Sequence, residues 1–245
     1  MKIALCQFGV VWNDRRANRE KISALVSAEV LRGADWLLFP EMTLSGFSMD
    51  AASAAIDSSD MEFFAALARR YNIAVSFGGV RDGRNEMITL DRSGRQISAY
   101  AKIHLFTLGG EDKVYKAGDC QTTFELGKMR VAPAICFDLR FSCLFWNARK
   151  STDLFAIIAG WPASRAAHWQ TLLMARAMET QSYVVGVNCL GTAPEGTRFR
   201  GGSMIIDPFG NVLLDCRDSE GVFISEADIN SAVPADIRAS FPLSS

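Results

Sequence analysis

A cysteine with the surroundings of a nucleophile stands at position 136. The residues before it, Val131 to Ile135, form an apolar, strand-like run, and the residues after it are amphipathic and helix-like. A thiol at a strand-to-helix turn is held out of the plane of the sheet. The backbone N–H groups that begin the next helix can lower the thiol pKa from about 8.5 and can receive an oxyanion. The position of Cys136 therefore predicts nucleophilic chemistry.

An acid and an amine stand in comparable positions. A buried, strand-like run leads through Pro40, which ends ladder pairing, to Glu41. The run 96–104 alternates polar and apolar residues and places Lys102 near a strand end. Strand ends of an α/β protein bring catalytic groups from distant parts of the chain together. We therefore expect Glu41, Lys102 and Cys136 to form one site.

The composition is that of an ordinary globular protein and narrows the possible partners. Of the 245 residues, 49% are hydrophobic and 22% are charged, and the formal net charge is −1. Such a chain has no electrostatic reason to bind nucleic acid or an anionic membrane. Its length suits one domain, which we expect to span residues 1–245. The N-terminus is too short and strand-like for a signal peptide, and no run of about 18 apolar residues occurs. We expect a cytoplasmic protein whose partner is a small molecule.

The other common catalytic and cofactor patterns are missing from the sequence. The six cysteines are scattered without a C-x-x-C pair, so most are expected to be small buried hydrophobic residues. The histidines, His104 and His168, form no H-E-x-x-H motif, and no G-x-S-x-G elbow or phosphate loop occurs. We expect neither a metal nor a cofactor. A Cys–His dyad remains open, although both histidines fit better as hydrogen-bonded structural residues.

The periodicity of the sequence indicates many short strands and a few helices. Strands are expected at residues 3–8, 35–39, 73–80, 86–91, 96–102, 121–126, 129–135, 153–158, 183–189, 203–207, 211–215 and 221–226, and helices at 14–32, 58–71, 139–149 and 165–181.

The second half of the chain echoes the first. Asp91 and Gly94 of one hairpin correspond to Asp207 and Gly210 of another, at an offset of 116 (207 − 91 and 210 − 94). Aspartate at the first turn position and glycine at the last suit a hairpin. The strand beginning at Asp35 is echoed 118 residues later (153 − 35). Two similar halves predict an α/β fold, a four-layer α-β-β-α sandwich of two stacked, mostly antiparallel sheets with internal pseudo-two-fold similarity.

Three stretches resemble the signatures of the nitrilase superfamily, the carbon–nitrogen hydrolases, in the superfamily's order. They are Phe39-Pro40-Glu41, Tyr100-Ala-Lys102-Ile-His104 and Cys136-Phe-Asp138-Leu-Arg140-Phe141. Residues 160–170 and 176–179 resemble the omega-amidase branch, which hydrolyses the terminal amide of 2-oxo acids such as 2-oxoglutaramate. The similarity spans nearly the whole chain. True nitrilases usually have Trp-Glu after the cysteine, unlike this chain, and Ser142 stands where the branch often has proline.

The resemblance implies a role for each polar residue in a thioester mechanism. Glu41 is expected to act as general base toward Cys136 and to return the proton to leaving ammonia, which requires a carboxyl pKa nearer neutrality than about 4.3. Lys102 and the backbone N–H of Phe137 are expected to face the oxyanion. Glu111 matches the superfamily's second glutamate, which orients Lys102 and the substrate amide. The alternative for Glu111 is a solvated loop acid.

A 2-oxo acid amide carries a carboxylate, so an arginine is expected in the pocket. Arg165 is the first candidate, and Arg198 and Arg200, on a glycine-rich loop, come next. Arg140 is expected to pair with a structural acid instead. Trp161 is expected to wall the acyl side of the substrate or to pack in the core.

Other functions remain open at this point. An N-carbamoyl amide hydrolase or a general short-chain aliphatic amidase would use the same apparatus. A catalytically silent binding or scaffold protein is a different class, and retention of all three polar residues argues against it. The resemblance implies a homodimer. Whether Cys143 can trap Cys136 as a disulfide under oxidation also stays open.

Overall fold

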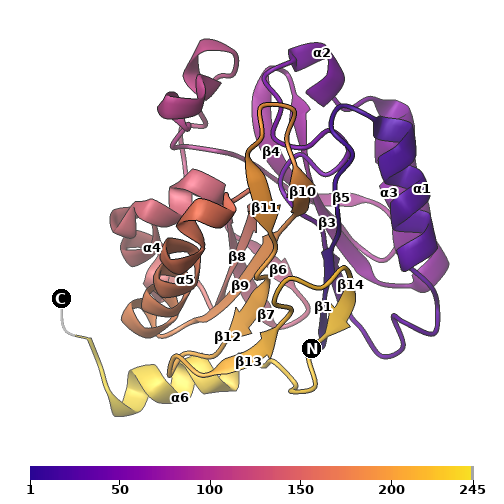
Figure 1. Ribbon diagram of the computed structural model, residues 1–245. Helices are drawn as coiled ribbons and strands as arrows, with labels where there is room; N and C mark the ends of the chain where they lie inside the picture. The colour runs from indigo at the N-terminus through magenta and orange to yellow at the C-terminus, as the bar shows by residue number, and fades with distance from the viewer. Residues whose placement is uncertain (244–245) are drawn as a thin grey trace.

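Two six-stranded sheets lie face to face between layers of helices (Figure 1). The computed structural model describes residues 1–243. The first sheet has the strand order β14 (Gly221–Ile224), β1 (Ile3–Gln7), β2 (Trp36–Leu38), β3 (Ala74–Arg81), β4 (Arg84–Leu90), β5 (Gln96–Ala101). The second has the order β13 (Val212–Asp215), β12 (Met204–Ile206), β9 (Tyr183–Asn188), β8 (Leu154–Ala159), β7 (Met129–Ile135), β6 (Phe124–Leu126). A separate ribbon pairs β10 (Leu190–Thr192) with β11 (Arg198–Arg200).

Helices cover the outer faces of the two sheets (Figure 1). The first sheet carries α1 (Arg15–Leu25) and α3 (Ser58–Tyr71), with the short α2 (Ala51–Ala54) near one end, and the second carries α4 (Ser142–Ala148) and α5 (Ala166–Thr180). The chain continues after β14 into α6 (Ala232–Ser240). Short 3₁₀ turns fill several connections: η1 (Thr107–Gly109), η2 (Glu111–Lys113), η3 (Cys136–Arg140), η4 (Arg149–Ser151) and η5 (Ala163–Arg165).

Strand alternation separates two layers of core. Along β1, Ile3 and Leu5 pack in the cluster that holds the inner face of the second sheet, including Ala134. The residues between and after them, Ala4 and Cys6, pack instead in the cluster beneath α1 and α3. Successive side chains of a strand point to opposite faces, and here both faces are covered. This explains why the strand reads as a continuous apolar run in the sequence.

The two sheets repeat the same pairing pattern, which confirms the internal similarity. β1-β2-β3 and β7-β8-β9 are parallel, and the remaining neighbours in each sheet are antiparallel. The register shifts between Thr89 and Leu90 in one hairpin and between Ile205 and Ile206 in the other, again an offset of 116 (205 − 89). The predicted α-β-β-α sandwich is therefore confirmed, with sheets that are mixed.

Several predicted boundaries are wrong for local reasons. The helix expected over 14–32 ends at Leu25, because Val26 adopts an extended conformation. The helix expected over 139–149 is preceded by the 3₁₀ turn η3, and the extended backbone of Phe141 separates that turn from α4. The sequence patterns also missed α6 and the β10–β11 ribbon.

Candidate active site

The turn that carries Cys136 is strained and held from below. Cys136 begins η3 directly after β7 with φ +46, a left-handed conformation that costs a non-glycine residue about 1–3 kcal/mol. The buried carboxylate of Asp138 holds this turn in place. Its Oδ2 accepts hydrogen bonds from the Ile135 N–H at 3.0 Å and the Tyr100 hydroxyl at 2.8 Å, and its Oδ1 accepts from the His104 N–H at 2.8 Å. Asp138 thus connects the cysteine turn to the strand that leads to Lys102.

Glu41 reaches the site because the backbone crosses closely over β3. A Cβ atom on Gly78 would lie 2.5 Å from the Met42 nitrogen and 2.8 Å from the Glu41 Cα, so only glycine leaves room for this crossing. The Glu41 side chain is buried, and its Oε2 accepts a hydrogen bond of 2.8 Å from the Gly160 N–H at the end of β8. Its other oxygen, Oε1, accepts from the Lys102 ammonium at 2.9 Å. Glu41 therefore joins the two sheets across the site.

Glu111 belongs to the same buried cluster. It begins η2 and is fully buried, while its neighbour Asp112 is exposed. Its Oε2 lies 2.8 Å from the Lys102 ammonium and accepts a hydrogen bond of 2.6 Å from the Phe106 N–H. The alternative of a solvated loop acid is wrong. A single ammonium contacts two carboxylates, which matches the positions expected for Glu41, Lys102 and Glu111.

Asn85 is a member of the cluster that the sequence patterns missed. Its fully buried side chain lies on β4, and its Nδ2 donates to Glu41 Oε1 at 2.8 Å and to Glu111 Oε1 at 2.9 Å. The Lys102 ammonium donates to the same two oxygens. An amide inside a strand gave no signal of its own, because its role depends on two acids distant in the sequence.

The electrostatics of the cluster keep the thiol neutral at rest. Burial raises the pKa of the Cys136 thiol well above its usual value, Glu41 adds to the rise, and Lys102 acts against it. The expectation that helix N–H groups lower this pKa is wrong, because desolvation and the neighbouring carboxylates outweigh them. Burial by itself would lower the pKa of Lys102, but Glu41, Cys136 and Glu111 outweigh burial and raise it. The resting site thus holds an ammonium and a thiol that needs a base.

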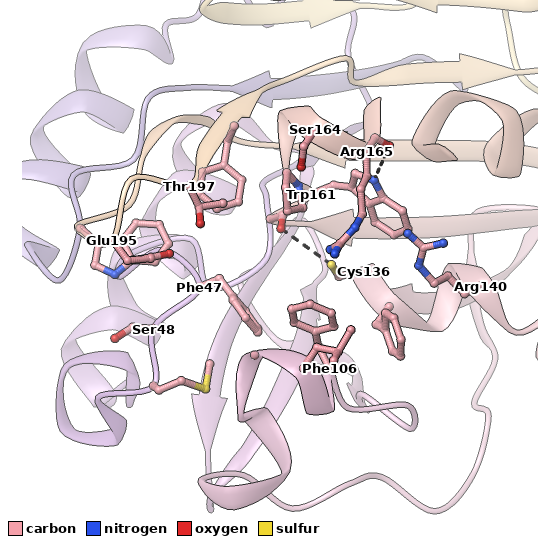
Figure 2. Close-up of a pocket in the computed structure, with 18 residues that line it drawn as sticks. Phe47, Ser48, Phe106, Cys136, Arg140, Trp161, Ser164, Arg165, Glu195 and Thr197 are labelled. Atoms are coloured by element: carbon pink, nitrogen blue, oxygen red, sulfur yellow. Dashed lines mark hydrogen bonds between the residues drawn. The ribbon is translucent and has the colours of Figure 1, made fainter. Parts of the chain in front are cut away.

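A cavity of about 710 Å³ opens above Cys136. Its lining residues include six aromatic side chains: Trp12, Phe47, Phe106, Phe137, Trp161 and Phe199. Figure 2 shows Phe47 and Phe106 beside the thiol with Trp161 above it. The Cys136 sulfur lies 3.9 Å from the Gly160 carbonyl oxygen. A substrate in this cavity would approach the thiol from the solvent side. The Glu41–Lys102 cluster would lie on the opposite, buried side of the reacting amide.

Residues 2–237 match the family described as carbon-nitrogen hydrolase. This chain belongs to the carbon–nitrogen hydrolases. It is 34% identical to the omega-amidase YafV of Escherichia coli K12 over 99% of this chain and 94% of that protein. It is 31% identical to the 2-oxoglutaramate amidase of Bacillus subtilis over 98% of this chain and 95% of that protein. Its fold superposes on XC1258 of Xanthomonas campestris, a CN-hydrolase superfamily protein with an arsenic adduct in the active site, with a TM-score of 0.89 and 31% identity, over 99% of this chain and 95% of that one.

The predicted substrate-binding residues of this carbon–nitrogen hydrolase take different places. Phe137, Trp161 and Arg165 all line the cavity. Trp161 also packs in the core, since its ring lies against Trp169 with centroids 5.5 Å apart. Arg198 and Arg200 are exposed on β11, and the alternate residues of that segment, Thr197 and Phe199, face the cavity instead. This is the alternation that a strand requires.

Arg140 does not have the structural acid that the sequence suggested. Within residues 1–243, its guanidinium donates to His168 Nδ1 at 3.2 Å, lies 4.7 Å from the Trp161 ring centroid and forms no ion pair. It lines the cavity with Arg165. The prediction is wrong because contacts between distant segments decide which partner an arginine has, and the neighbouring sequence does not show those contacts.

The histidines of the enzyme have structural contacts. His104 Nδ1 lies 2.9 Å from Asp138 Oδ1, and its ring stacks on Phe141 at 3.6 Å. His168 contacts Arg140. Neither shows a contact with Cys136 in the described part of the chain, so the geometry does not favour a Cys–His dyad.

Residues 1–243 contain no group of three histidine, cysteine or acidic side chains placed to hold a metal ion. All six cysteines are free, and Cys143 is exposed while Cys136 is buried. No helix in the described chain is both long and apolar enough to cross a membrane.

Proposed function

We propose that this carbon–nitrogen hydrolase cleaves the terminal carboxamide of a 2-oxo acid, such as 2-oxoglutaramate or 2-oxosuccinamate, to a carboxylate and ammonia. The observation that carries the proposal is the buried Glu41–Lys102–Glu111 cluster beneath Cys136, in a chain whose relatives include the omega-amidase YafV and the 2-oxoglutaramate amidase of Bacillus subtilis. The reaction has two stages that share one thioester.

In the first stage the thiol attacks the amide. Glu41 takes the proton of Cys136, and the sulfur forms a bond to the amide carbon. The carbonyl electrons move to oxygen, where the Lys102 ammonium and the Phe137 N–H stabilise the negative charge. Loss of one such donor typically costs about 3–4 kcal/mol of barrier. Glu41 then gives its proton to the amide nitrogen, the C–N bond breaks, and ammonia leaves.

In the second stage water releases the acid. Glu41 takes a proton from a water molecule, which attacks the thioester carbon. The C–S bond breaks, and the cysteine recovers its proton from Glu41. The carboxylic acid so formed loses its remaining proton to solvent and leaves as a carboxylate. Glu111 takes no proton in this scheme. It holds Lys102 through their contact of 2.8 Å and keeps the ammonium aimed at the oxyanion.

The substrate carboxylate would bind Arg165. Its guanidinium lines the cavity and lies 5.8 Å from the Phe106 ring centroid. Trp161 and Phe137 would hold the short carbon chain between them. A planar guanidinium matches a carboxylate with two parallel hydrogen bonds.

We further propose that residues 1–245 form one domain that works as a homodimer in the cytoplasm. Free cysteines suit a reducing compartment. Exposed Met178, Phe209 and Phe241 support an interface, because Met178 lies against the hairpin that carries Phe209 and the carbonyl of Phe241 accepts from Gln181, just after α5. Light scattering of the purified protein tests the dimer: a monomer mass at micromolar concentration would contradict it.

The test of function is ammonia release from three kinds of amide. The wild type and Cys136→Ala are assayed with 2-oxoglutaramate, a simple aliphatic amide and an N-carbamoyl amino acid. Turnover of the oxo acid that vanishes in the variant supports the proposal. Turnover of another amide alone would replace the substrate, and no turnover of any would favour a silent scaffold.

A further inference from the structure

Two arginines without acidic partners face the cavity on the same side as the nucleophile. Arg140 and Arg165 both line it and are half-buried, and neither forms an ion pair within residues 1–243. Figure 2 shows Arg165 beside Cys136 and Arg140 on the same side. Glu195 is the acidic residue among the described lining residues, and it lies on the other side of Phe47.

The two guanidinium groups act on each other. Burial lowers the pKa of Arg140, and the charge of Arg165 lowers it further. Repulsion between two like charges in a partly desolvated wall costs free energy, and a bound anion offsets that repulsion. An anion that binds here therefore gains from both groups.

Arg140 is held ready for such an anion. Its guanidinium lies 4.7 Å from the Trp161 centroid and 5.9 Å from the Phe137 centroid. The hydrogen bond to His168 uses one nitrogen, Nη2. Contacts with aromatic faces restrict the guanidinium plane without using its remaining N–H donors. These donors are free to bind a carboxylate.

We infer that Arg140 joins Arg165 in a site that binds the carboxylate of the substrate and excludes an ammonium group on the adjacent carbon. This inference rests on the proposed function, because it deepens the choice of substrate. A 2-oxo acid amide and the matching 2-amino acid amide differ at that carbon, where one has an uncharged oxygen and the other an ammonium. Near two guanidiniums with no acid beside them, the ammonium is repelled. The enzyme would thus hydrolyse 2-oxoglutaramate and spare glutamine.

Four amides distinguish binding of the carboxylate from exclusion of the ammonium group. Pentanamide is neutral, glutaric acid monoamide adds the carboxylate, 2-oxoglutaramate adds the oxo group, and L-glutamine carries the ammonium instead. Arg140→Met is expected to lower kcat/KM for glutaric acid monoamide and 2-oxoglutaramate by about 10- to 100-fold, mainly through KM. Its effect on pentanamide is expected to be less than about threefold. The ratio of kcat/KM for glutaric acid monoamide to that for glutamine is expected to fall, because one source of repulsion is gone.

Matched variants check the interpretation. Arg198→Met removes the same charge from an exposed position that does not line the cavity, and it is expected to leave all four values within about twofold. Arg140→Lys keeps the charge but loses the planar fork, so it is expected to fall between wild type and Arg140→Met. Thermal unfolding of each variant shows whether the fold is retained.

A second readout does not depend on amidase activity. Iodoacetate and iodoacetamide both alkylate a thiolate with loss of iodide, but only iodoacetate carries a carboxylate. The ratio of their rates at Cys136, read on its peptide by mass spectrometry, cancels any change in thiol reactivity. Arg140→Met is expected to lower the iodoacetate-to-iodoacetamide ratio about tenfold.

The outcomes separate the inference from the proposed function. A lower alkylation ratio in a protein that hydrolyses no 2-oxo acid amide would retain the carboxylate site and reject the substrate. An alkylation ratio and an amide preference equal to those of Arg198→Met would overturn the inference.

Discussion

Lys102 Nζ lies 2.9 Å from Glu41 Oε1, and both side chains are withdrawn from solvent. The same ammonium lies 2.8 Å from Glu111 Oε2. Two buried carboxylates therefore share one cation, and the neutral donor Asn85 completes their hydrogen bonds. The Glu41 carboxyl thus contacts the ammonium and also acts on the thiol, whose pKa it helps to raise.

Removal of the shared cation is expected to damage both activity and stability. Lys102→Met leaves two adjacent buried carboxylates uncompensated, which typically costs about 3–5 kcal/mol of unfolding free energy. The rate is expected to fall by about 100- to 1000-fold through loss of the oxyanion donor. Urea unfolding and ammonia release measure the two effects. Lys113→Met, at an exposed position, is the control, and equal behaviour of the two variants would contradict the account.

Replacement of Glu41 by glutamine is expected to make the thiol more acidic while abolishing turnover. Glu41 helps to raise the pKa of Cys136, so removal of its charge stabilises the thiolate and lowers that pKa. The pH at which iodoacetamide alkylation of Cys136 reaches half its maximum rate should move down. Because Cys120 and Cys143 are exposed, the reaction is followed on the Cys136 peptide. An unmoved or higher midpoint would show that Glu41 does not act on the thiol.

We expect Asn85 to position the two carboxylates. The effect of replacing it is expected to depend on the charge of the new side chain. Asn85→Leu removes a donor from each carboxylate and should lower kcat about 10- to 100-fold. Asn85→Asp adds a third carboxylate, whose pKa in the folded protein is raised above its unfolded value by its neighbours. The added destabilisation is therefore largest near pH 7 and shrinks as the pH falls and the new group takes up a proton. Urea unfolding at pH 7 and pH 5 measures it, and a penalty that is the same at both values would argue against the shared cluster.

The close approach of the Glu41–Met42 backbone to β3 predicts that a side chain added at Gly78 causes a steric clash. Gly78→Ala places a methyl group 2.5 Å from the Met42 nitrogen and 2.8 Å from the Glu41 Cα, and backbone atoms cannot yield easily. We expect a loss of about 1–3 kcal/mol in stability together with a large loss of kcat from displacement of Glu41. Gly83→Ala, where φ is +72 but no atom lies within 4 Å, should cost about 1 kcal/mol without loss of kcat. Normal turnover by Gly78→Ala would contradict this account of how Glu41 is placed.

The sequence predicted those features that depend on residues close together in the chain. The aspartates of the two hairpins behave alike: Asp91 Oδ1 accepts from the Ser93 N–H, and Asp207 Oδ1 accepts from the Phe209 N–H. Glu41, Lys102 and Cys136 were recognisable because each follows or ends a strand, and the resemblance to a family implies their roles.

The features that were missed depend on contacts between distant segments. Asn85 has its role only because β2 and η2 bring two acids to it. The thiol pKa was misjudged because burial and carboxylates from elsewhere in the chain outweigh the local turn. Arg140 was assigned a structural acid because nothing near it in the sequence shows that it faces a cavity.

The central claim is a thioester on Cys136, and a mass spectrum of the enzyme stopped by acid during turnover of 2-oxoglutaramate tests it most directly. The account predicts a Cys136 peptide heavier by the mass of the substrate less ammonia, and no such adduct in Cys136→Ala, which should also release no ammonia. Sustained ammonia release by Cys136→Ala, or an acyl adduct on another residue, would contradict it.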